Sequence, residues 1–142
     1  IEDISSENCF KYNWLKEKGL VNSIKNLKIL SNDTLAKILN IITTTRPSWN
    51  GHNSSGWRKD IFSVNGFDER MKYGGEDREL GERLINFGIR PKQIRYSAIC
   101  LHLYHERGYV NENSWNQNNR IRSETRIQKL EWTNYGLVKD KN

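Results

Sequence analysis

The segment YGGEDRELGERLINFG, residues 73–88, decides how the middle of the chain folds. Two glycines come first, and apolar side chains then recur at helical spacing at Leu80, Leu84 and Ile85. This spacing places the three side chains on one face of an amphipathic helix. Gly88 follows the last of them and is suited to end the helix. We therefore predict a helix after Asp77 whose apolar face lies on a sheet or on another helix.

The start of this helix carries the strongest chemical pattern in the chain, Tyr73-Gly74-Gly75-Glu76-Asp77. Glycines lack a Cβ and let the backbone come close to a ligand, and the two carboxylates stand at the positive end of the helix. Either carboxylate is suited to take a proton from a hydroxyl group, as a general base does. The structural alternative is that Gly74-Gly75 is only a turn and that Asp77 is an amino-terminal cap.

A second pattern lies downstream, where residues 94–103 are rich in Ile, Tyr and Leu and alternate loosely, which predicts a strand. The strand would end at His102-Leu103-Tyr104-His105. A strand end that continues into a polar loop is a usual place for a ligand. Two imidazoles three residues apart share a metal only where the chain turns, so the alternative is one packed and one exposed histidine.

Further helices are predicted from caps and breakers. Asn32 or Asp33 can begin a helix that stops at residues 43–47, and its apolar face would consist of Leu35, Ile38, Leu39 and Ile42. Residues 12–30 predict one or two weaker helices with a break at Gly19. Residues 57–62 predict a short helix and residues 65–66 a turn. Ser114 can cap a last helix over residues 115–130.

The small, polar segment 49–56 and the aromatic residues near it add further candidates for ligand contact. Among them are Asn53 and Trp57, while Tyr73 stands beside the double glycine and is the best placed. Tryptophans more often fill cores than bind ligands, and His52 is expected to be a surface or hydrogen-bonded histidine and not a third ligand. The aromatic residues concerned are Trp49, Trp57, Tyr73, Tyr104, Tyr109 and Trp115.

Length and composition fit one domain with a thin core. The chain has 142 residues, of which 35% are hydrophobic and 28% charged, so part of its apolar surface is expected to face a missing portion of the protein. No apolar run approaches the ~20 residues that cross a bilayer. The two cysteines, Cys9 and Cys100, lack the spacing of a metal or redox site, which favours a reduced, cytoplasmic location. Within the cytoplasm the protein would be either dissolved or bound at the periphery of the membrane. The net charge of +6 is dispersed, so nucleic acid is not expected as a partner.

The order of the motifs resembles the carboxy-terminal half of family 2 glycosyltransferases, above all the β-1,4-galactosyltransferase and chondroitin-polymerase type. The motifs that carry the resemblance run from about Gly51 to about Leu137: Gly51-His52-Asn53, Trp57-Arg58-Lys59-Asp60, Val64-Asn65-Gly66-Phe67-Asp68-Glu69, Gly74-Gly75-Glu76-Asp77 and His102-Leu103-Tyr104-His105. The resemblance implies the carboxy-terminal portion of an α/β nucleotide-diphospho-sugar transferase fold of the GT-A type, with extra helices. Residues 1–48 would be a helical excursion and residues 49–142 the acceptor-side catalytic part.

The resemblance also implies a site. Asp77 would be the base of an inverting transfer and Glu76 its neighbour, while Tyr73, Gly74, Gly75, Asn53 and Trp57 would contact substrate. His105 and His102 would hold a divalent cation, Mn²⁺ or Mg²⁺. The partners implied are a nucleotide-sugar donor, UDP-sugar in the first place, and a glycan acceptor, as in polysaccharide biosynthesis.

Two departures from the family limit what carries over. The chain has no Asp-x-Asp motif, which in the family binds metal and nucleotide, so the donor site would belong to a missing amino-terminal half and the isolated chain would be inactive. Arg78 stands where the galactosyltransferases continue with acidic residues, which leaves the acceptor undefined. The rival functions are a non-catalytic interaction domain and a nucleic-acid-binding module.

Overall fold

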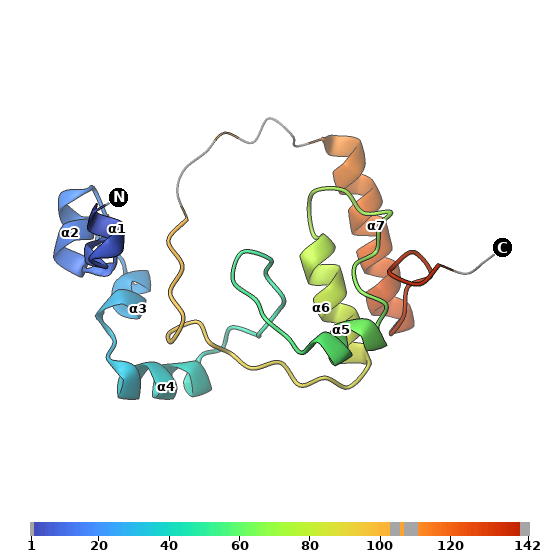
Figure 1. Ribbon diagram of the computed structural model, residues 1–142, viewed down its shortest axis with the longest axis horizontal. Helices are drawn as coiled ribbons and strands as arrows, with labels where there is room; N and C mark the ends of the chain where they lie inside the picture. The colour runs from blue at the N-terminus through green and yellow to red at the C-terminus, as the bar shows by residue number, and fades with distance from the viewer. Residues whose placement is uncertain (1, 103–105, 107–110, 140–142) are drawn as a thin grey trace. The chain divides into compact units, whose positions relative to one another are not determined.

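The computed structural model describes residues 2–102, 106 and 111–139, and contacts divide the chain into two units. The first unit consists of Ile1–Arg46 and Gln93–Leu103, and the second of Pro47–Lys92 and Tyr104–Asn142. Figure 1 shows helices joined by irregular segments. The described residues contain only an isolated bridge between Tyr135 and Lys139 and no extended strand, so the predicted α/β architecture is not confirmed.

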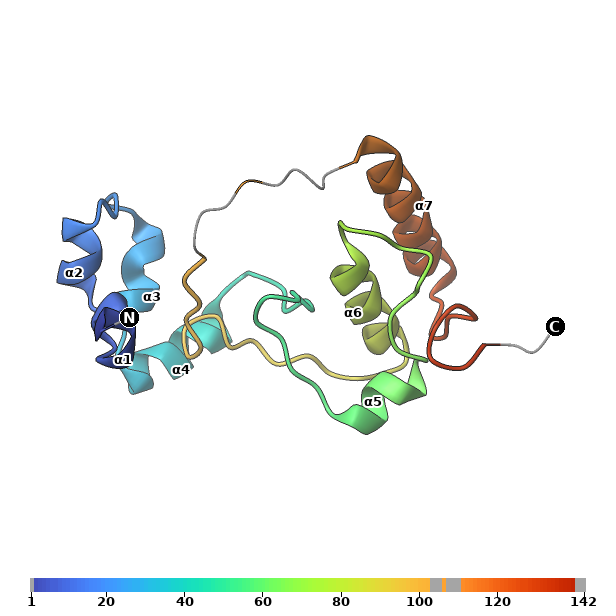
Figure 2. The same ribbon diagram turned by 45° about the horizontal axis from the view of Figure 1, so that its top comes forward.

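The first unit is a succession of short helices, as Figure 2 shows. They are α1 (Glu2–Ser5), η1 (Asn8–Phe10), α2 (Tyr12–Glu17), η2 (Ile24–Asn26), α3 (Leu27–Leu30) and α4 (Asp33–Ile42). Gly19, at φ +98°, separates the helices before and after it, as predicted. The side chain of Asn32 accepts a hydrogen bond from the amide of Leu35 at 2.9 Å and caps α4, which confirms the predicted start of this helix.

The predicted strand over residues 94–103 is wrong for its described part, residues 94–102. The amides of Ser97 and Ala98 both donate to the carbonyl of Ile94, which makes a turn there. The side chain of Asn40, on α4, then accepts from the amide of Tyr96 at 2.9 Å and donates to Ser97 Oγ at 2.7 Å. The side chain of Asn40 thus binds one backbone amide and the turn binds two others, so these groups are not available to a neighbouring strand.

The second unit is built around α6 (Glu76–Asn86), which follows α5 (Arg58–Ser63) in the chain. Its core consists of Val64, Leu80 and Leu84, against which Trp49 and Ile89 pack. A Cβ on Gly81 would lie 2.7 Å from Cβ of Trp49, so the backbone of α6 and this tryptophan are in direct contact. Gly88, at φ +96°, ends the helix as predicted. Ile85 was expected to point inward, but 47% of it is exposed because it lies beyond the edge of the buried face.

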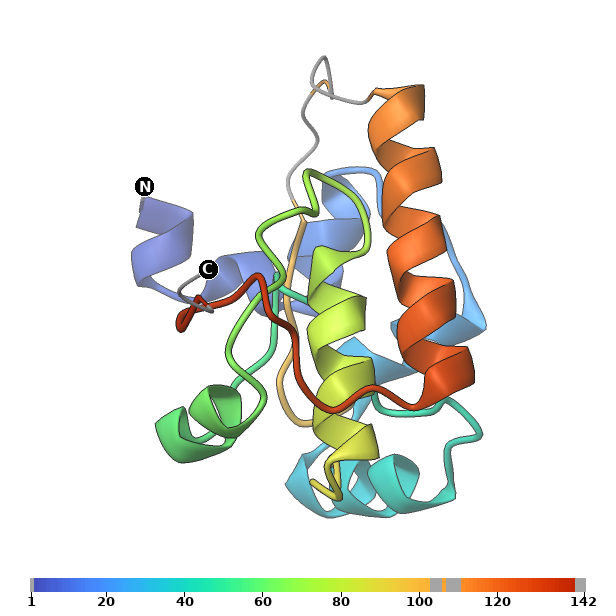
Figure 3. The same ribbon diagram turned by 90° about the vertical axis from the view of Figure 1, so that its right-hand side faces the viewer.

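The last helix, α7 (Glu112–Gln128), packs side by side with α6, and Figure 3 shows the two running in the same direction. Contacts at both ends agree with this orientation. Trp115, in the first turn of α7, lies against Gly74, and Asn86 at the end of α6 donates to the carbonyl of Leu130 at 2.8 Å. The predicted cap at Ser114 is wrong, since Asn111 caps α7 and accepts from the amide of Ser114 itself.

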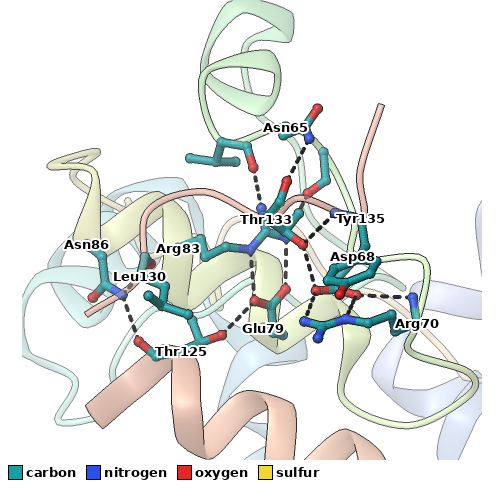
Figure 4. Close-up of polar contacts among 12 residues, drawn as sticks. Asn65, Asp68, Arg70, Glu79, Arg83, Asn86, Thr125, Leu130, Thr133 and Tyr135 are labelled. Atoms are coloured by element: carbon teal, nitrogen blue, oxygen red, sulfur yellow. Dashed lines mark hydrogen bonds and ion pairs between the residues drawn. The ribbon is translucent and has the colours of Figure 1, made fainter. Parts of the chain in front are cut away.

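A buried ion pair joins α6 to its surroundings (Figure 4). Arg83 and Glu79 are almost fully buried and meet through two hydrogen bonds of 2.8 Å. The remaining donors of Arg83 bind the carbonyls of Val64 and Gly66, the latter at 2.7 Å. Thr125 of α7 donates to Glu79 at 2.9 Å. One pair of charges therefore connects α6, the turn before it and α7.

The turn at residues 65–68 holds the carboxy-terminal segment. Asn65, in the left-handed conformation at φ +66°, donates from its side chain to the carbonyls of Thr133 and Val138 at 2.6 and 2.7 Å. Asp68 accepts from Arg70 and from the hydroxyl of Thr133 at 2.7 Å each. Burial alone would raise the pKa of Asp68, but the hydrogen bonds from Arg70 and Thr133 outweigh burial and lower it.

Within the described part of the chain, no helix is both long enough and apolar enough to cross a membrane.

Replacement of Arg83 by leucine is expected to lower the free energy of unfolding by about 3–5 kcal/mol, because it leaves the buried carboxylate of Glu79 without a positive partner. Joint replacement of Glu79 and Arg83 by leucine should still destabilise, since the carbonyls of Val64 and Gly66 also lose their donors. Chemical denaturation measures both, with exposed Arg78→Leu as the control on the same helix. A loss below about 1 kcal/mol, typical of a surface pair, would contradict the structural role of the pair.

The lowered pKa of Asp68 makes stability depend on pH. The carboxylate stabilises the fold fully above its unfolded pKa of about 3.9, and this contribution is lost as the pH falls through the lower folded pKa. Asp68→Asn should therefore unfold at lower urea concentration at neutral pH and lose less stability on acidification. Glu69→Gln, at an exposed ion pair with Lys139, is the control. Equal acid sensitivity of Asp68→Asn and the wild type would show that other carboxylates govern acid unfolding.

Candidate functional site

The segment 73–77 enters α6 through two glycines with positive φ, +115° at Gly74 and +89° at Gly75. Side chains with a Cβ rarely adopt such angles, which explains the glycines in physical terms. Gly75 is the amino-terminal cap of the helix. The alternative interpretation of Asp77 as the cap is therefore wrong, and its carboxylate is engaged elsewhere.

Asp77 connects the start of α6 to the segment 49–56. Its Oδ2 accepts a hydrogen bond from the amide of Gly51 at 2.9 Å, and its Oδ1 accepts one from the amide of Arg78 at 2.7 Å. The carboxylate is half-buried and lies in the first turn of the helix, where the helix dipole favours negative charge. An ionised carboxylate has about four acceptor positions, so these two contacts leave room for a hydroxyl donor.

Glu76 turns back toward the glycines. Its Oε2 accepts from the amide of Gly74 at 2.7 Å, which fixes the loop immediately before the helix. The two neighbouring carboxylates therefore make different contacts. Glu76 braces the backbone of its own loop, whereas Asp77 binds a segment that lies 26 residues earlier in the chain.

Side chains of helix α7 cover Gly74 and Gly75. A Cβ on Gly74 would lie 3.0 Å from Cε2 of Trp115, and a Cβ on Gly75 would lie 3.0 Å from Cδ of Arg122. The space beside both glycines is thus filled by protein, so packing and positive φ account for these glycines without a ligand. The side-chain amide of Asn118 donates to carbonyls of the same loop.

Sequence reasoning missed Asn118 and Arg122. The available indication was the spacing of residues 115, 118 and 122, which puts them on one face of a helix. Their nearness to residues 74–75 is a tertiary contact that spacing alone does not reveal.

The predicted aromatic contacts differ in exposure. Trp49 is part of the core, in agreement with the interpretation of tryptophans as core residues. Trp57, just before α5, is 75% exposed. Tyr73 and Trp115, at the glycine loop, are 37% and 40% exposed. Asn53 lies in an exposed turn, where its amide donates to the carbonyl of Asn50 at 2.9 Å.

Neither of the two histidines predicted as metal ligands belongs to the described part of the second unit. His102 is exposed and belongs to the first unit, while His105 falls outside the described residues, as do Tyr104 and Tyr109. Among the residues that the structure describes, no group of three or more His, Cys, Asp and Glu side chains is placed to hold a metal.

Comparison with known proteins gives one similarity. Residues 44–106 match the family model described as the N-terminal domain of galactosyltransferase. No curated protein and no solved structure matches the chain. The matched range contains the segment 73–77, Gly51 and α5, whereas α7 lies beyond it. The match supports a galactosyltransferase-like glycosyltransferase domain, and it does not point to family 2 in particular.

Proposed function

We propose that this chain takes part in the transfer of a sugar from a nucleotide-sugar, UDP-sugar in the first place, to a hydroxyl group of a glycan. The observation that carries the proposal is the position of Asp77. Its carboxylate lies in the first turn of α6, is held by the amide of Gly51 at 2.9 Å, and falls inside the range that matches the galactosyltransferase family.

In the proposed reaction Asp77 acts as the general base. It takes the proton of the acceptor hydroxyl while the hydroxyl oxygen forms a bond to the anomeric carbon. The bond between that carbon and the diphosphate oxygen breaks on the opposite face, and the nucleoside diphosphate leaves with the bonding electrons. Attack opposite to the leaving group inverts the configuration at the anomeric carbon. The contact with Gly51 fixes the base before the acceptor arrives, which reduces the reorganisation required.

The other residues have supporting roles in this proposal. Glu76 holds the amide of Gly74 and so fixes the start of α6. Tyr73 offers partly exposed aromatic surface for a sugar ring. Gly74 and Gly75 are proposed to approach the substrate only through their backbone, because α7 fills the space where their side chains would be. Asn53 and Trp57, from the same unit as Gly51, are proposed as further contacts with substrate.

A divalent cation, Mn²⁺ or Mg²⁺, is proposed as a cofactor, with His105 and His102 among its ligands. Such an ion would stabilise negative charge on the departing diphosphate. These ions prefer oxygen ligands, so carboxylates other than those grouped in the described residues would have to complete the site. The chain by itself is therefore proposed to bind nucleotide-sugar poorly and to be inactive.

Asp77→Asn, in the gene product that contains this chain, is expected to lower turnover by about 10²–10⁴-fold, because an amide does not take up a proton at neutral pH. The fold should persist, since the amide oxygen can still accept from Gly51. Initial rates and thermal unfolding are measured together, with Asp60→Asn in the first turn of α5 as the matched control. Turnover near the wild-type level would refute the base, and loss of folding would instead assign Asp77 a structural role.

His105→Ala is expected to weaken activation by Mn²⁺ or Mg²⁺ more than His102→Ala does, because His105 matches the metal-binding histidine of the family that the sequence resembles, whereas His102 matches a further ligand position of the galactosyltransferases. Activity titrated against each ion, together with direct measurement of Mn²⁺ binding by electron paramagnetic resonance, gives the comparison. If neither change alters Mn²⁺ binding or the metal dependence of activity, both histidines are structural and the cation is held elsewhere.

A further inference from the structure

Three side chains of α7 converge on the loop that precedes the two carboxylates. Trp115, Asn118 and Arg122 are spaced by three and four residues, so they lie along one face of the helix. Trp115 covers Gly74 and Arg122 covers Gly75, each with a side-chain atom 3.0 Å from where a Cβ would be. Arg122 is itself held by Glu82 of α6 at 2.6 Å.

Asn118 makes the central contact. It is 1% exposed, and its side-chain amide lies 3.0, 3.3 and 2.9 Å from the carbonyl oxygens of Lys72, Tyr73 and Gly74. Two amide hydrogens are thus shared among three consecutive carbonyls. The amide has one possible orientation, because a rotated side chain would direct its oxygen at the three carbonyl oxygens.

The loop needs such support because of its composition. Two adjacent glycines have more backbone freedom than any other pair of residues, and local preference does not hold them at positive φ. Binding three successive carbonyls to one buried amide fixes the path of the chain up to Gly74. Glu76 then fixes the amide of Gly74, and Asp77 follows directly in the helix.

We propose that Asn118 is the positioning residue of the acceptor-side carboxylates, so that α7 forms part of the functional site although it lies outside the range that matches the galactosyltransferase family. This inference rests on the proposed function of Asp77 as base. Asn118 acts through the loop and not on the substrate: it sets where the segment 74–77 stands relative to Gly51 and to the bound acceptor.

The test is made in the gene product that contains this chain. It compares Asn118→Asp and Asn118→Ala with Asn119→Ala, which changes an exposed asparagine on the same helix. Asn118→Asp keeps the shape but places a carboxylate against three carbonyl oxygens. Both changes at Asn118 should speed amide hydrogen exchange at residues 74–77. They should also lower kcat/KM for the acceptor by up to about 100-fold, the effect of a displacement near 1 Å, while KM for the donor stays unchanged. Asn119→Ala should match the wild type in all respects.

Wild-type exchange and kinetics in Asn118→Asp would overturn the inference, as would an equal loss toward donor and acceptor, which signals general destabilisation. Trp115→Leu extends the test if Asn118 variants do not fold, because Trp115 is partly exposed and its loss should loosen the same amides and raise KM for the acceptor. If the wild-type gene product that contains this chain transfers no sugar from any nucleotide-sugar tested, the proposed function and the catalytic meaning of Asn118 are both overturned. Faster exchange in the Asn118 variants would then report only a structural contact.

Discussion

The ion pair between Arg83 and Glu79 is the interaction on which the second unit depends. Removing two charges from water costs several kcal/mol for each ion, and the cost is offset only where every remaining donor and acceptor finds a partner. Here the carbonyls of Val64 and Gly66 and the hydroxyl of Thr125 supply further partners to the pair. The helix, the turn before it and the neighbouring helix therefore hold one another in a single arrangement, with only a small apolar core beside them.

The candidate site inherits its geometry from this arrangement. Because α6 is fixed along its length, its first turn and the carboxylate of Asp77 have a defined position in the unit. Gly51 then reaches Asp77 from the segment that also carries Trp49, which packs on the same helix at Gly81. A substitution in the core is therefore expected to shift the position of the carboxylates, since α6 carries both the core residues and Asp77.

Local patterns predicted local structure well. Asn32 begins α4 and Gly88 ends α6 because caps act through hydrogen bonds to the nearest turn. The predicted strand failed because strand composition at residues 94–102 requires a partner strand, which no local pattern supplies. Arg83 and Glu79 have the spacing of a surface pair, so their burial was not foreseen. The contact between Gly51 and Asp77 and the contacts of α7 with the glycine loop join segments that are far apart in the sequence, so no local pattern predicts them. The catalytic and metal-binding roles stay predictions.

The parallel course of α6 and α7 has an electrostatic consequence. Their amino ends lie together, as the contact between Gly74 and Trp115 shows, so the partial positive charges of two helix ends add instead of cancelling. Two like ends repel unless negative charge is placed among them. Glu76, Asp77 and Glu112 occupy the first turns and provide it. The acidic residues at this end of the pair thus stabilise the helix packing itself, and neutralising them would weaken the association of the two helices most strongly at low ionic strength.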